Sequence, residues 1–117
     1  MGYRLYACKL YRVERDTVKG GYFNHLTEEI NRMFLEECEG VGWDGNDSIE
    51  YAETVFVPKD DMARLIGKFA DPEIGTELIK KYNLKPSEYT HLDMVKMLAD
   101  FLSAADGHND FVALTWS

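Results

Sequence analysis

The sequence is poor in cysteine and in basic residues, and it has no long hydrophobic run. Its two cysteines, Cys8 and Cys38, are too far apart for the paired spacing of zinc or redox motifs, so we expect two reduced, partly buried thiols. No apolar stretch approaches the ~20 residues that a membrane-spanning helix needs. The first residues lack the apolar block of a signal peptide. We therefore expect a cytoplasmic protein.

The shortage of basic residues also limits the partners. The chain has 13 Lys and Arg against 21 Asp and Glu, a net charge of −8. Nucleic-acid duplexes and anionic membranes are bound mainly through Lys and Arg, so we expect no direct nucleic-acid or membrane contact. Residues 24–61 hold eleven acidic and two basic residues, a net charge of −9. The negative charge is therefore concentrated in one segment.

The length of 117 residues and the 45% hydrophobic content predict one α+β domain spanning residues 1–117. Hydrophobic periodicity predicts the order β-α-β-α-α-α-β. We expect a small three-stranded sheet, open to mixed pairing, with about four helices packed mainly on one face.

The first half of the chain is divided by its periodicity and its glycines. A long strand is predicted over Arg4–Val13, followed by a turn at Lys19–Gly21. A helix is predicted from Asn24, as its N-cap, to Glu39. A second strand is predicted over Ile49–Val57, where apolar and polar residues alternate.

The second half carries clearer helix signals. A short helix is predicted from about Asp60, and Asp71 with Pro72 marks the start of another. Thr90 and Asp93 have the spacing of a capping box for the last helix.

The chain should end in a strand over Phe111–Trp116. Its alternation places Val112, Leu114 and Trp116 on one face, and we expect them to be buried under the Met94–Leu102 helix.

No metal or cofactor motif is complete. Asp44, Asn46 and Ser48 match the first ligands of a calcium-binding loop, but Ile49 and Val55 stand where that loop needs glycine and glutamate. The histidines are too widely spaced for a zinc motif. Nucleophile elbows and phosphate-binding glycine loops are also missing. We therefore expect no metal, no cofactor and no catalytic residue.

Two alternative functions stay open. An enzyme acting on a small molecule would use His108 and Asp110 as an acid/base pair just before the last strand. A self-associating structural module would pair through its terminal strand, and a homodimer is compatible with the sequence.

The preferred hypothesis is a small, acidic, non-enzymatic binding protein, an inhibitor or adaptor for a basic protein partner. In charge and size it is analogous to immunity proteins and phage anti-defence proteins, whose partners include nucleic-acid-handling proteins. The alternative is that the acidic segment only keeps the chain soluble. The predicted partner-binding residues are Glu36, Glu37, Glu39, Trp43, Asp44 and Asp47.

Overall fold

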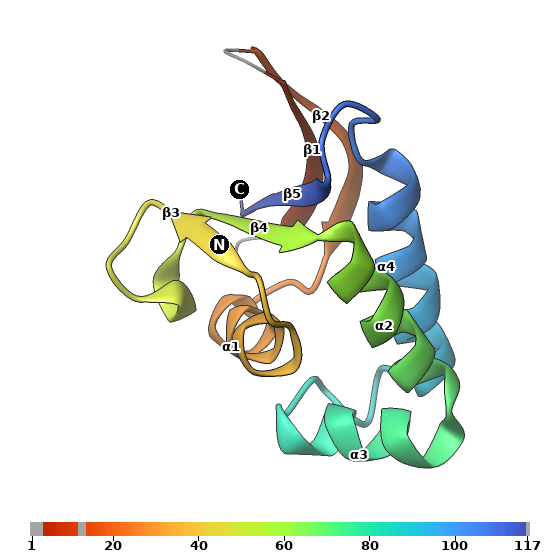
Figure 1. Ribbon diagram of the computed structural model, residues 1–117. Coiled ribbons are helices and arrows are strands. Elements are labelled where there is room, and N and C mark those ends of the chain that lie inside the picture. The colour runs from red at the N-terminus through yellow and green to blue at the C-terminus, as the bar shows by residue number, and fades with distance from the viewer. Residues whose placement is uncertain (1–3, 12–13, 117) are drawn as a thin grey trace.

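The computed structural model describes residues 4–11 and 14–116, and within them it contains four α-helices, one 3-10 helix and a five-stranded sheet (Figure 1). The elements are β1 (Leu5–Tyr11), β2 (Glu14–Tyr22), α1 (Thr27–Glu37), β3 (Gly42–Asp44), η1 (Ile49–Tyr51), β4 (Thr54–Pro58), α2 (Lys59–Ala70), α3 (Pro72–Lys81), α4 (His91–Ala104) and β5 (Phe111–Trp116). The predicted α+β class and the four helices are confirmed. The prediction of three strands is wrong.

The two strands beyond the predicted three are β2 and the short edge strand β3. Strand β2 belongs to a hairpin that the sequence pattern did not indicate. Lys19–Gly21 was predicted to be a turn, but it lies within β2, which pairs antiparallel with β1. The register shifts twice, between Leu5 and Tyr6 and between Ala7 and Cys8. Such bulges disturb the alternation of side chains, and glycine is common at them. The end of the predicted strand, Arg12–Val13, lies outside the described residues.

The strand order is β2-β1-β5-β4-β3, and every described pairing is antiparallel. The mixed sheet that the sequence left open is therefore not formed. The C-terminal strand β5 lies at the centre, where Leu114 pairs with Ala7 on one side and Val55 on the other. Self-association through this strand would need one of these pairings to break, because β5 has no free edge.

The predicted strand Ile49–Val57 is a strand only in its second half. In β4, Val55 and Val57 are buried and Phe56 is partly exposed, as the alternation predicted. Residues Ile49–Tyr51 instead form η1. The amide of Asn31 donates hydrogen bonds to the carbonyl oxygens of Ile49 and Ala52, at 2.9 and 3.4 Å. A buried side chain from α1 thus donates hydrogen bonds to the carbonyl groups at both ends of this turn.

Two helix starts agree with their sequence signals. The Asp71 carboxylate accepts hydrogen bonds from the backbone N–H groups of Glu73 and Ile74, at 2.9 and 3.1 Å, and caps α3. Thr90 and Asp93 form the predicted reciprocal capping box of α4. These caps satisfy donors that a helix cannot satisfy internally.

The start of α1 differs from its prediction. Asn24 does not cap the helix, which begins at Thr27 without a side-chain cap. Phe23 and His25 on either side of Asn24 have φ values of 60° and 64°, in the left-handed region. The Lys85 ammonium donates a hydrogen bond to the Asn24 carbonyl at 3.2 Å and helps to hold this turn.

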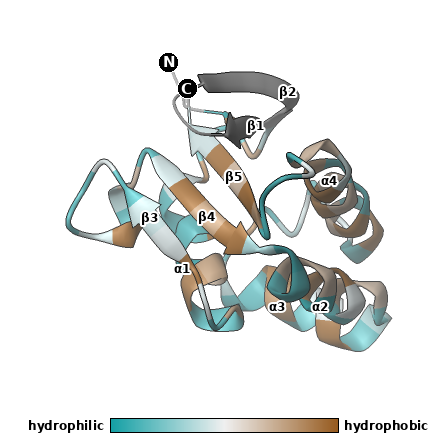
Figure 2. Cartoon of the chain, turned by 45° about the horizontal axis from the view of Figure 1, so that its top comes forward, coloured by the Kyte–Doolittle hydropathy of each residue, from teal (hydrophilic) through white to brown (hydrophobic). Residues whose placement is uncertain are grey.

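The helices α1 and α2 lie on one side of the β3–β4–β5 part of the sheet, α4 packs against β1, β2 and β5, and α3 packs beyond α2 (Figures 1 and 2). Figure 2 shows β4 and β5 as largely hydrophobic and the β3–η1 loop as mainly hydrophilic. Val112, Leu114 and Trp116 are buried, as predicted. Trp116, however, lies at α1 rather than under the Met94–Leu102 helix, because its indole N–H donates to the Asn31 side-chain oxygen at 3.0 Å.

Asn31 therefore joins three parts of the chain. Its side chain is fully buried, and its three hydrogen bonds link α1 to both ends of η1 and to the last residue of β5. Buried amides are costly unless they are hydrogen-bonded, so this geometry favours one arrangement of these segments.

We predict that Trp116→Phe lowers the free energy of unfolding by about 1–3 kcal/mol, because the Asn31 oxygen loses its donor. Asn31→Ala should also destabilise, and the double variant should lose less than the sum of the two. Urea denaturation measures all three. Ser103→Ala removes an exposed hydrogen bond and is the control, with an expected change below about 0.5 kcal/mol. Strictly additive losses for Asn31 and Trp116 would contradict the coupling.

Candidate functional site

The predicted partner-binding residues lie along the end of α1, edge strand β3 and the loop that follows it. Their side chains come from elements that are close together in the sequence, with β3 at one edge of the sheet (Figure 1). Five of the six are exposed, namely Glu36, Glu39, Trp43, Asp44 and Asp47. The exception is Glu37.

Glu37 is committed to contacts within the molecule. Its side chain is 10% exposed, and its carboxylate lies 3.1 Å from the Lys68 ammonium and 3.5 Å from that of Lys81. It also accepts a hydrogen bond from the Tyr82 hydroxyl. Since Lys68 belongs to α2 and Lys81 to α3, Glu37 ties three helices together and is not available to a partner.

The network around Glu37 sets its charge. Burial by itself raises the pKa of this carboxyl, but the Tyr82 hydrogen bond and the ammonium groups of Lys68 and Lys81 outweigh it, so that the pKa lies below its usual value of 4.5. Burial and the same hydrogen bond raise the pKa of Tyr82. Glu37 is therefore held ionised and Tyr82 protonated at neutral pH.

A second structural carboxylate, Asp61, was not singled out from the sequence. It is buried, and it accepts hydrogen bonds from the backbone N–H groups of Glu39 and Gly40, at 3.2 and 3.0 Å, and from the Arg64 guanidinium. Asp61 thus fixes the chain as it leaves α1 and runs toward β3. No spacing rule indicates this contact, because its partners are backbone groups about twenty residues away.

Exposed apolar side chains occur among the exposed carboxylates. Leu35, Trp43 and Tyr51 are 44%, 37% and 58% exposed. Arg32 connects α1 and η1, which carry Leu35 and Tyr51, because its guanidinium lies 2.8 Å from the Glu28 carboxylate on α1 and 3.5 Å from that of Glu50 on η1.

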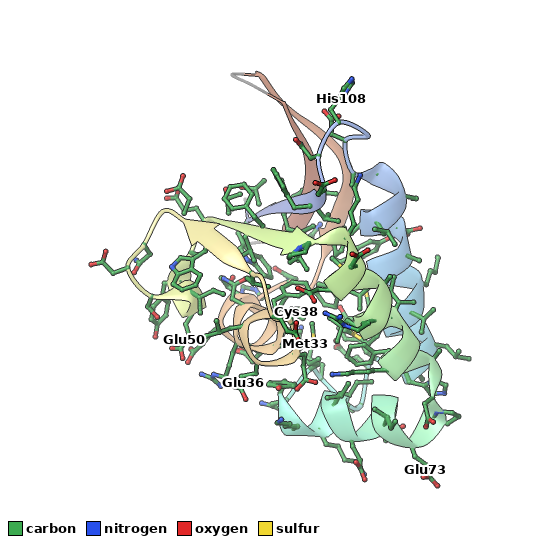
Figure 3. The ribbon with its side chains drawn as sticks, in the orientation of Figure 1. Met33, Glu36, Cys38, Glu50, Glu73 and His108 are labelled. Atoms are coloured by element: carbon green, nitrogen blue, oxygen red, sulfur yellow. The ribbon has the colours of Figure 1, made fainter. Side chains whose placement is uncertain are left out.

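We define the acidic surface as the exposed acidic and large apolar residues of α1, β3, η1 and the adjoining loops, together with the half-exposed Glu50. Its members are Leu35, Glu36, Glu39, Trp43, Asp44, Asp47, Glu50, Tyr51 and Glu53. In the view of Figure 3, Glu36 and Glu50 lie on the α1 and η1 side of the molecule, and Glu73 and His108 lie at other places. The sequence indicated the charge of this region, but not the exposure of Leu35 and Tyr51.

The loop within the acidic surface is internally braced. The Asp44 side chain accepts a hydrogen bond from Gly45 N–H at 2.8 Å, and the Asn46 side chain accepts one from Ser48 N–H at 3.1 Å. Gly45 has a φ of 96°, and a side chain there would meet Glu53 at 2.8 Å. Asp44 and Asn46 therefore shape the turn, which needs glycine at position 45.

Other chemistry finds little support in the part of the chain that the structure describes. There, no group of three His, Cys, Asp or Glu side chains is placed to hold a metal ion. Cys38 is buried, and that burial raises the pKa of its thiol to about 11, so the thiol stays protonated at neutral pH. The Cys8 side chain lies outside what the structure describes.

The enzyme hypothesis named His108 and Asp110. His108 is exposed, and its Nδ1 lies 2.9 Å from the Asp106 carboxylate. The Asp110 carbonyl accepts a hydrogen bond from Lys59 N–H at 2.8 Å, and its side chain is exposed. The two described grooves, of about 580 and 330 Å³, are both lined by other residues.

No known family model, curated protein or solved structure matches this chain. Among the described helices, none combines the length and the apolar character needed to cross a membrane.

The lowered pKa of Glu37 predicts a pH-dependent contribution to stability. A group whose pKa falls on folding stabilises above its unfolded pKa, and this stabilisation is lost as the pH falls through the folded value. Glu37→Gln should therefore be destabilising near pH 7, and the difference from the wild type should shrink below about pH 4.5. Thermal unfolding between pH 3 and 7 measures this. The exposed Glu77→Gln on α3 is the control, and a Glu37→Gln deficit that did not change with pH would contradict the prediction.

Proposed function

We propose that this chain is a small, acidic, non-enzymatic binding protein. It acts as an inhibitor of a basic protein partner, or as an adaptor for it, and binds that partner through the acidic surface. One observation carries the proposal. Exposed carboxylates and three exposed large apolar side chains, Leu35, Trp43 and Tyr51, belong to the same adjoining elements.

The two kinds of side chain support different parts of binding. Carboxylates attract a basic partner over a distance and orient it as it approaches. Trp and Tyr are enriched among the residues that contribute most to interface affinity. A surface that served solubility alone would need the charges, but it would gain nothing from exposing Leu35, Trp43 and Tyr51.

The charge of the surface also indicates the class of partner. Proteins that handle nucleic acids carry basic surfaces that neutralise phosphates, and an acidic surface can occupy the same region. The analogy with immunity and anti-defence proteins is one of charge and size. A homodimer through this surface is disfavoured, because like charges would face each other.

The proposal predicts a salt-sensitive association that depends on particular carboxylates. A partner would be captured on the immobilised chain and identified by mass spectrometry, and its association rate measured at several salt concentrations. We expect the triple variant Glu36→Lys, Glu39→Lys, Asp47→Lys to lower the association rate at least ~10-fold at low salt and to flatten its salt dependence. All three side chains are exposed, and the interaction of Glu36 with the Tyr82 hydroxyl is weaker than that of Glu37 with the same hydroxyl, so the fold should be retained.

The matched control changes the total charge equally at other places. The triple variant Glu73→Lys, Glu77→Lys, Glu88→Lys alters exposed residues of α3 and the loop that precedes α4. It should retain most of the association rate of the wild type. Equal losses in the two variants would mean that net charge alone acts, and an unchanged rate in both would remove the proposal.

A further inference from the structure

A cavity of about 330 Å³ opens within the acidic surface. It is lined by Thr27, Tyr51, Ala52, Glu53 and Trp116. Tyr51 and Glu53 belong to the acidic surface, while Trp116 and Ala52 are buried and form the inner wall. The volume is at the lower end of the range for ligand pockets, and it suits one side chain better than a large molecule.

Hydrogen bonds hold the walls of this cavity in place. Trp116 N–H donates to the Glu53 carbonyl at 2.9 Å, and the Trp116 indole N–H donates to Asn31. Ala52 N–H donates to the Ile49 carbonyl at 3.1 Å, and Glu53 N–H donates to the Asp44 carbonyl at 3.0 Å. The cavity is therefore formed before any partner arrives, which lowers the entropic cost of binding.

The chemistry of the lining favours a cation with a flat face. Tyr51 and Trp116 are the aromatic residues of the lining, and Glu53 and Thr27 are its polar residues. A guanidinium group can stack on an aromatic ring while its N–H groups donate to a carboxylate and a hydroxyl, whereas an ammonium group has no such planar fork.

An anion would meet repulsion at the same place. Thr27 is the first residue of α1, whose N-terminus by itself would attract negative charge. Glu28 is paired with Arg32, but Glu29 in the first turn opposes this attraction, and Glu53 lines the cavity itself. The charged side chains around the cavity thus favour a cation.

We infer that this cavity receives an arginine side chain of the basic partner. The inference rests on the proposed function and deepens it, because it names the residue type that the acidic surface recognises. The aliphatic part of the arginine would lie along Tyr51 and Trp116, and its guanidinium would face Glu53 and Thr27.

The direct test uses the wild-type chain and short blocked peptides. In ¹H–¹⁵N NMR titrations, Gly-Arg-Gly should shift the Trp116 indole signal and the Ala52 and Glu53 amide signals saturably. Gly-citrulline-Gly, which keeps the shape without the charge, should bind with an affinity at least ~5-fold lower. The affinity of Gly-Lys-Gly should lie between those of the other two peptides. No saturable shift with the arginine peptide, or equal affinity for the citrulline peptide, would overturn the inference.

Variants separate this inference from the proposed function. Glu53→Gln and Tyr51→Ala should each lower the affinity for the arginine peptide and for the captured partner about 5-fold. Glu73→Gln should leave both affinities unchanged. If the triple variant of the acidic surface loses the partner while Glu53→Gln and Tyr51→Ala bind it normally, the arginine site is wrong and the proposed function stands. If the partner tolerates all of these changes, both fail.

Discussion

The arrangement depends above all on the buried amide of Asn31. Its hydrogen bonds reach Ile49 and Ala52 at the two ends of η1 and Trp116 at the end of β5. A buried amide without partners is costly, so α1, η1 and the central strand have to meet in this one register.

The acidic segment contains buried carboxylates that hold the fold together and exposed carboxylates that face solvent. Glu37 binds lysines of α2 and α3, and Asp61 holds the backbone after α1. Both are satisfied within the fold. The remaining carboxylates can then face solvent beside Trp43 and Tyr51, on elements that Asn31 and Asp61 keep in place. The same segment therefore stabilises the molecule and presents a charged surface.

Local signals in the sequence predicted the parts of the fold that local chemistry determines. The cap at Asp71, the capping box at Thr90 and the alternation of β5 involve neighbouring residues, and the structure agrees with each. The hairpin was not predicted because its bulges break the alternation of side chains. The prediction of a strand at η1 was wrong because a distant asparagine donates hydrogen bonds to the carbonyl groups there. The sequence placed Glu37 among the binding residues, since nothing local reveals lysines 31 and 44 residues away.

The central claim is that a basic partner docks on the acidic surface, and site-specific photo-crosslinking tests it most directly. A benzophenone amino acid would replace Tyr51, which is 58% exposed, or, as the control, Leu92 on α4, which is 62% exposed. The account predicts that position 51 crosslinks a basic protein through an arginine-containing segment and that position 92 does not. A partner crosslinked equally from both positions, or from position 92 alone, would contradict it.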